Sequence, residues 1–203
     1  MHPSILRFGG LLAAAVLSTA AQGAEAIDTS KLSDSSVTLV DLSKRGSPGK
    51  TFAAGTIINA PMQDVCTLLQ NYSAYPGFMP NTTSAKVSPA DGGQSLVDIT
   101  LSLPMGKIKK YRLRMTPKVS PASCILAWKL VPWPGLKQEE TIVDTTGQWH
   151  LTPGATPGKT VVHYSVYTDP GPIPFGLGWI VDSLSKDSIP QTLDAVRKRV
   201  VQR

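Results

Sequence analysis

The sequence is poor in cysteine, in charged residues and in long hydrophobic runs, and each shortage excludes a class of protein. Two cysteines among 203 residues are too few for a disulfide scaffold or a four-thiolate metal site. Charged residues make up 17% of the chain and hydrophobic residues 41%, a balance that excludes wholesale disorder. Beyond the first segment, no hydrophobic stretch reaches the roughly 20 residues that a membrane-spanning helix needs.

Length and charge leave several kinds of protein open. A chain of 203 residues favours one domain, or at most two small ones. Its 17 glycines and 17 prolines indicate many loops without the bias of a low-complexity chain. The formal net charge of +6 is compatible with nucleic acid, with anionic lipid or with neither. Composition alone therefore does not identify a partner.

The N-terminus has the pattern of a secretion signal. Arg7 precedes an apolar run from Phe8 to Leu17, and small residues then allow cleavage after Gly23 or as late as Ala26. The run is much shorter than a bilayer-spanning helix, which disfavours a membrane anchor, and no cysteine directly follows it to carry a lipid. The sequence predicts a signal peptide over residues 1–23 and an exported protein, periplasmic or secreted.

Export would place Cys66 and Cys124 in an oxidising compartment, where the pair can form a structural disulfide. Cys66 lies in an apolar helical run and Cys124 opens an apolar strand, so two buried free thiols are the alternative. The sequence leaves both states open. Neither cysteine has the neighbours of a catalytic thiol.

The residues after the signal predict a single α+β domain behind a polar lead-in over 24–50, which holds one candidate edge strand at 37–42. A β-branched and apolar strand follows over 51–60. Pro61 is tolerated in the first turn of a helix, and Met62, Val65 and Leu68 have helical spacing. Turn residues then break the chain repeatedly between 75 and 81.

From Val97 onward, apolar and polar residues alternate with the period of β-strands. Turn residues bound each of the alternating runs, which lie at 97–103, 111–115, 126–130, 149–151 and 162–166. This pattern predicts an antiparallel meander with one apolar face. A helical stripe over 177–184, continued over 193–200 after an interruption at 188–190, predicts a C-terminal helix that covers this face.

Two stretches of the domain resemble the START / Bet v 1-like (SRPBCC) superfamily. INAPMQDV at 58–65, with YPGFMP at 75–80, resembles the first strand and helix of that superfamily, where an Ala-Pro helix start and a Tyr-Pro turn recur. TVVHY at 160–164, with DPGPIP at 169–174, resembles the strand-to-helix junction of START lipid-transfer domains. The resemblance covers about residues 51–203.

The resemblance implies a helix-grip fold, in which a curved antiparallel sheet wraps around a long C-terminal helix and leaves an internal hydrophobic cavity. It implies a START-like domain over 51–203 that takes a lipid or another hydrophobic ligand. One departure concerns the strand at 109–114. Many START domains begin this strand with an Arg-Asp pair, and here the acidic partner is absent from it.

A curved sheet and one helix cannot interdigitate fully, so a ligand cavity is expected between them. Plain core packing is the alternative for each residue expected to face it. A buried tyrosine or tryptophan tip needs a partner, which a ligand hydroxyl or carbonyl could supply. The residues expected to line the cavity are Ile99, Leu101, Tyr111, Leu113, Met115, Leu126, Trp128, Trp149, Tyr164, Ile180, Val181 and Leu184.

Trp133 lies in a loop between two prolines and a glycine. It is expected either to act as a lid or membrane contact, or to fold back on the sheet as a turn residue. The basic residues near 107–114 and 197–199 are typical of a solvated surface, and they also suit transient contact with anionic lipid headgroups. Nucleic acid is not an expected partner of an exported protein.

The expected function is that of a monomeric, exported binding or transfer protein for a lipid or other hydrophobic small molecule, with no metal and no cofactor. The alternatives are a cyclase- or dehydratase-like enzyme for a bulky apolar substrate and an interaction module without a cavity. No catalytic residue is predicted, because His150, His163 and Asp98 all have the outward phase of their strands. The sequence also contains no nucleophile elbow and no P-loop.

Overall fold

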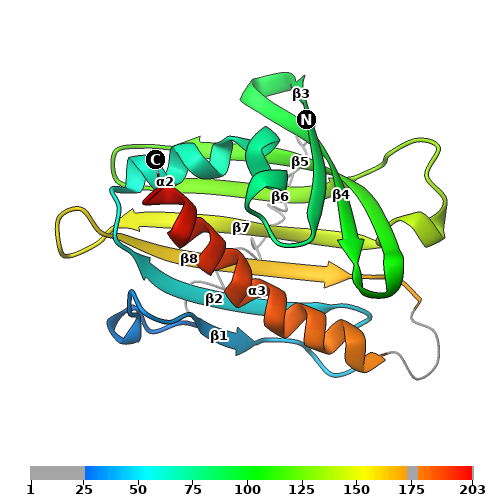
Figure 1. Ribbon diagram of the computed structural model, residues 1–203, viewed down its shortest axis with the longest axis horizontal. Coiled ribbons are helices and arrows are strands. Elements are labelled where there is room, and N and C mark those ends of the chain that lie inside the picture. Colours follow the sequence, from blue (N-terminus) through cyan, green and yellow to red (C-terminus); the bar gives the residue numbers. More distant parts are fainter. Residues whose placement is uncertain (1–25, 173–177, 203) are drawn as a thin grey trace, which may run out of the picture.

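The computed structural model describes residues 26–172 and 178–202, except for the side chains of 105 and 178–185. Within these residues the chain forms two layers, a curved sheet and a pair of α-helices that lie across one face of it (Figure 1). The predicted signal peptide, residues 1–23, lies outside the described residues. Among the described helices, none is both long enough and apolar enough to span a membrane.

The sheet is antiparallel throughout the described chain, and its strand order is β1-β2-β8-β7-β6-β5-β4-β3. Strands β4 to β8 are successive neighbours, as the alternating pattern predicts, while β2 returns to pair with β8. The bounds are β1 Thr38–Asp41, β2 Lys50–Ile58, β3 Thr82–Ala90, β4 Gln94–Leu103, β5 Lys107–Val119, β6 Cys124–Val131, β7 Asp144–Pro153 and β8 Thr160–Asp169.

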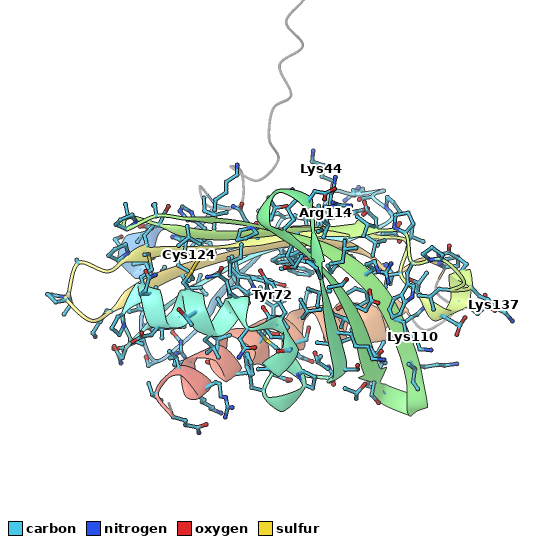
Figure 2. All side chains as sticks on the ribbon, turned by 90° about the horizontal axis from the view of Figure 1, so that it is seen from above. Lys44, Tyr72, Lys110, Arg114, Cys124 and Lys137 are labelled. Atoms are coloured by element: carbon cyan, nitrogen blue, oxygen red, sulfur yellow. A yellow bond between two sulfur atoms is a disulfide. The ribbon has the colours of Figure 1, made fainter. Side chains whose placement is uncertain are left out.

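Strand β3 is an edge strand that the turn-rich sequence before Val97 did not predict. Most of its residues are exposed or half-buried, so it lacks the apolar alternation of the inner strands. Pro89 lies within it, and proline is tolerated at an edge because no neighbouring strand needs its missing N–H. The β3–β4 hairpin curls toward the helices and gives the sheet its concave face (Figure 2).

The described residues form two α-helices, α2, Met62–Gln70, and α3, Gly178–Val200. Asp64 lies in the first turn of α2, where a negative charge suits the helix dipole. The shorter 3-10 helices are η1 Thr29–Lys31, η2 Tyr72–Gly77, η3 Asp91–Gly93, η4 Pro104–Gly106 and η5 Gln138–Glu140.

Helix α3 runs without a break through the interruption expected at 188–190. Pro190 removes one backbone hydrogen bond from the helix interior. The helix continues because its core face is anchored, with Ile189, Leu193 and Val196 all buried against the sheet and α2. Tertiary packing therefore outweighs the local preference of proline.

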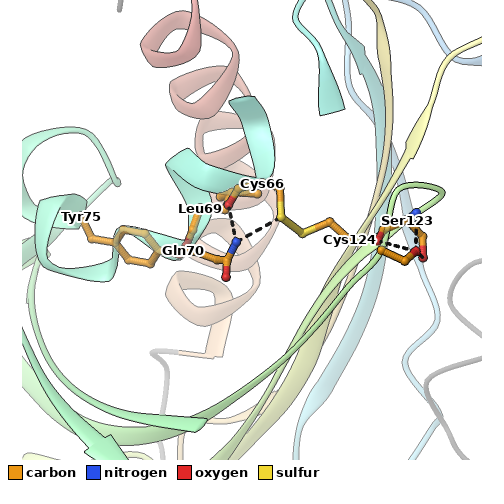
Figure 3. Close-up of a disulfide and its surroundings, with 7 residues drawn as sticks. Cys66, Leu69, Gln70, Tyr75, Ser123 and Cys124 are labelled. Atoms are coloured by element: carbon orange, nitrogen blue, oxygen red, sulfur yellow. Dashed lines mark hydrogen bonds between the residues drawn. A yellow bond between two sulfur atoms is a disulfide. The ribbon is translucent and has the colours of Figure 1, made fainter. Parts of the chain in front are cut away.

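A disulfide between Cys66 and Cys124 joins α2 to the first residue of β6, with a Cα–Cα distance of 6.1 Å (Figure 3). Both residues are fully buried. The side-chain amide of Gln70 donates hydrogen bonds to the carbonyl oxygen and the Sγ atom of Cys66. The bond therefore fixes the short helix against the strand that lies beneath it.

The lead-in packs on the opposite, convex face of the sheet. Ile27 and Leu32 form a second apolar cluster there with Ala53 and Val161. Gly55 belongs to this contact, because a Cβ on it would lie 2.9 Å from the Leu32 side chain. The lead-in thus covers the convex face over β2 and β8, while the concave face of these strands and of their neighbours lines a cavity.

Candidate ligand-binding cavity

A cavity of about 360 Å3 lies between the concave face of the sheet and α3. Seven strands contribute to its wall, β2 to β8, and η2 and α3 close it from the helix side. Its lining is mainly apolar. The volume is at the small end of the range of about 300–1,000 Å3 that is usual for ligand pockets.

The structure places most of the predicted ligand-facing residues on this wall. Leu126 is fully buried but does not line the cavity, and the side chains of Ile180, Val181 and Leu184 lie outside the described residues. Those that line it are Ile99, Leu101, Tyr111, Leu113, Met115, Trp128, Trp149 and Tyr164.

Several lining residues were missed by the sequence reasoning. Phe52 and Val166 lie opposite one another on β2 and β8, and a reading of the phase of β2 would have found Phe52. Tyr72 and Tyr75 come from η2, whose position under the sheet no local pattern reveals. The other missed residues include Lys50, Met79, Pro80, Asn81, Thr82, Val97, Leu103, Lys109, Ile142, Thr145, Thr168, Pro170, Ser188, Ile189 and Thr192.

An aromatic cluster forms the middle of the wall. The Tyr164 ring lies with its centroid 4.6 Å from that of Trp149 and 5.6 Å from that of Trp128. Tyr111 and Tyr164 are half-buried, and burial nevertheless raises the pKa of both phenols above the usual 10. Both residues line the cavity, so part of their accessible surface faces it.

The tyrosines of η2 differ in how their hydroxyls are used. The Tyr75 hydroxyl donates to the Leu69 carbonyl oxygen at 2.6 Å. Tyr72 is only 6% exposed, and its hydroxyl has no hydrogen-bond partner within the described part of the chain. Desolvation raises the pKa of Tyr72 to about 12. A buried phenol without a partner carries a free-energy cost.

The far end of the cavity, where β7 begins, is more polar. Lys109 occupies an inward position of β5, and its Nζ donates to the carbonyl oxygens of Glu139 and Thr141 at 3.0 and 2.6 Å. Burial lowers the pKa of this amine. Lys50 lines the same end from β2, opposite Thr168. Lys109 thus holds the β6–β7 connection beside the cavity.

Trp133 lies outside the cavity wall. Its ring is 5.3 Å from the guanidinium carbon of Arg112, which lies on the convex face of β5. Arg112 in turn forms two hydrogen bonds to Asp98 on the neighbouring strand, at 2.5 and 2.8 Å. Asp98 therefore supplies the acidic partner that the strand of Arg112 lacks, and Trp133 folds back on the sheet over this ion pair.

The histidines are also on the convex face. His150 and His163 are cross-strand partners on β7 and β8, with ring centroids 6.5 Å apart. His163 Nε2 lies 3.4 Å from the Thr29 hydroxyl of the lead-in, and burial lowers the pKa of this ring. Across residues 26–172 and 178–202, no three His, Cys, Asp or Glu side chains are grouped to hold a metal ion.

No protein-family model and no curated protein matches this chain. Several solved structures are similar to it. A STAR-related lipid transfer protein from Xanthomonas axonopodis has a TM-score of 0.70 at 21% identity, over 81% of this chain and 93% of that one. Human StAR-related lipid transfer protein 5 has a TM-score of 0.69 at 16% identity, over 82% and 83%.

A third similar structure is the Zhui aromatase/cyclase from Streptomyces sp. R1128. Its TM-score is 0.61 at 15% identity, over 76% of this chain and 95% of that one. Identities this low show the fold and leave the activity open. The matches agree with the curved eight-stranded sheet and the C-terminal helix of the described chain. The chain therefore adopts the helix-grip fold of START domains.

Proposed function

We propose that this protein binds or transfers a lipid or another hydrophobic small molecule, which it holds in the cavity under α3. The observation that carries the proposal is the lining itself, an apolar wall that contains a small number of polar groups directed at the same space. Ligand sites of proteins have this composition, whereas a core without function is packed to near-crystalline density.

The enzyme alternative requires a group that accepts a proton. Among the described lining residues there is no histidine, aspartate or glutamate. The phenols of Tyr111 and Tyr164 stay protonated at neutral pH because burial raises the pKa of each. They donate hydrogen bonds but do not act as bases. The amine of Lys109, whose pKa burial lowers, is already engaged with two backbone carbonyl oxygens, so the wall favours binding over acid–base catalysis.

The proposal includes export and a transient membrane contact. The first 23 residues act as a cleaved signal peptide, and the mature protein works as a monomer in the periplasm or outside the cell. Lys110 and Lys137 lie at the end of the molecule that carries the β4–β5 and β6–β7 turns (Figure 2). Ile108, which is 56% exposed, projects from the same region. This end suits brief contact with an anionic lipid surface.

Native mass spectrometry of the processed protein tests the binding function. Protein purified from the exporting host is expected to carry a hydrophobic molecule or to take one up from a total lipid extract. A protein that stays empty after exposure to the extract would refute the proposal. N-terminal sequencing of the exported form tests the signal peptide, with a mature start at residue 24 or 27 expected.

Membrane contact is tested separately by sedimentation with vesicles. Binding to phosphatidylglycerol vesicles is expected at low salt and should weaken at high salt, because exposed charges are screened. Lys110→Glu should weaken it further, while Lys44→Glu, on the convex face that points away from the helices, serves as the matched control (Figure 2). Equal binding to neutral phosphatidylcholine vesicles would contradict an electrostatic contact.

A further inference from the structure

Two tyrosines on the strands of the cavity wall have hydroxyls without a partner among the described residues. Tyr111 and Leu113 lie on the inward face of β5, and Tyr164 and Val166 lie on the inward face of β8. Neither hydroxyl has a hydrogen-bond partner among the described residues. A phenylalanine would serve equally well at both positions if apolar packing were their only role.

Other hydroxyls in the same wall are satisfied by the backbone. Those of Thr145 and Thr192 donate to the carbonyl oxygens of Tyr167 and Ser188, each at 2.7 Å, and Thr82 donates to Pro80 at 3.2 Å. The Tyr75 hydroxyl has the Leu69 carbonyl oxygen. Most other hydroxyls of the wall are thus engaged by the backbone, whereas the phenols of Tyr111 and Tyr164 stay open to a ligand.

The geometry keeps these phenols in place and close to one another. The ring of Tyr164 contacts those of both Trp128 and Trp149, which restricts the positions that its hydroxyl can take. The phenol of Tyr111 is near enough to that of Tyr164 to raise its pKa. Tyr72 lines the same space from the helix side, but its hydroxyl is buried. Donors from β5 and β8 thus share one mainly apolar space.

We propose that the ligand is an apolar molecule with a neutral carbonyl or hydroxyl oxygen, and that Tyr111 and Tyr164 donate hydrogen bonds to this oxygen. The proposal rests on the binding function above and names its ligand class. A plain hydrocarbon would leave both donors unpaired, and a charged group would have to be desolvated beside the tryptophans. The enclosed space holds roughly a dozen carbon-sized groups at about 30 Å3 each.

The test compares two probes of nearly equal shape. In 2-acetylnaphthalene a carbonyl oxygen stands where 2-isopropylnaphthalene has a methyl group. Isothermal titration should show that the double variant Tyr111→Phe/Tyr164→Phe binds the ketone about tenfold more weakly than the wild type for each hydrogen bond lost. Its affinity for the hydrocarbon should stay unchanged. Tyr167→Phe, on the outward face of β8, is the matched control and should change neither affinity.

The outcomes separate this inference from the binding function. If the double variant binds both probes as the wild type does, or weakens both equally, the hydrogen bonds are refuted while hydrophobic binding stands. If the wild type binds neither probe nor any lipid of the extract, the binding function itself fails. The single variants Tyr111→Phe and Tyr164→Phe, checked by thermal unfolding, give the same comparison should the double variant be unstable.

Discussion

Reduction of the Cys66–Cys124 disulfide tests how the cavity wall is held together. The two cysteines are 58 residues apart, and the loop that they close contains η2 and strands β3, β4 and β5. Chain-entropy arguments give a loop of this length about 4 kcal/mol of the free energy of unfolding. Domains are stable by only about 5–15 kcal/mol, so the bond accounts for a large share of the total.

Urea unfolding followed by tryptophan fluorescence measures this contribution. With a slope of about 2 kcal/mol per molar urea, reduction should lower the midpoint of the wild type by about 2 M. Comparing oxidised with reduced wild type changes no side-chain volume, so the difference reports the cross-link alone. The double variant Cys66→Ala/Cys124→Ala controls for the reductant, which should leave its midpoint unchanged.

Titration of free thiols in denaturant shows whether the Cys66–Cys124 bond was present in the protein used for the urea experiment. Unreduced protein should show no free thiol, and reduced protein should show two. If the reduced protein has two thiols yet unfolds at the midpoint of the oxidised form, the loop-closure reasoning is wrong. Free thiols in protein purified without reductant would instead show that the bond does not form.

Three further perturbations address the sheet. Burial lowers the pKa of His163 in the folded protein, so below about pH 6.5 the unfolded chain binds more protons than the folded one. The free energy of unfolding should therefore decrease as the pH is lowered, and it should decrease less in His163→Phe. Unfolding midpoints measured over this pH range test this, and equal slopes would contradict it. Gly147→Ala should cost about 1–3 kcal/mol and weaken ligand binding, because a Cβ would overlap the Trp128 indole; an unchanged melting temperature would count against it. Arg112→Ala should expose Trp133 and shift its fluorescence to the red, whereas an unshifted spectrum would show that Arg112 does not cover the ring.

The inner strands and their inward faces could be predicted from the sequence because side-chain direction repeats every two residues. Tyr111, Trp128 and Trp149 were assigned to the ligand side on this basis alone, and all three line the cavity. The local alternation of β4 to β8 is therefore enough to predict much of the cavity wall. The helical stripe over 177–200 predicted the covering helix, and the likeness to START domains supplied the curvature of the sheet, which no strand pattern contains.

Other parts of the site depend on the path of the chain through space. Tyr72 follows α2 in a turn-rich stretch, and only tertiary packing brings its ring to the cavity. Strand β3 is exposed at the sheet edge, so burial imposes no alternation on it. The passage of α3 through Pro190 reflects contacts of Leu193 and Val196, which local propensity does not include.

The cavity wall needs both β2 and β8, which are paired in the sheet but lie far apart in the sequence. The Thr160 hydroxyl donates to the carbonyl oxygen of Ala60, 100 residues earlier in the chain, and the two strands pair along the whole length between Lys50 and Ile58. Contacts between such distant segments must overcome a large loop-closure entropy and make folding slow. A chain still growing from the ribosome has β2 long before it has β8 or α3. The β2–β8 pairing that completes the cavity wall can therefore form only after nearly the whole domain has been made.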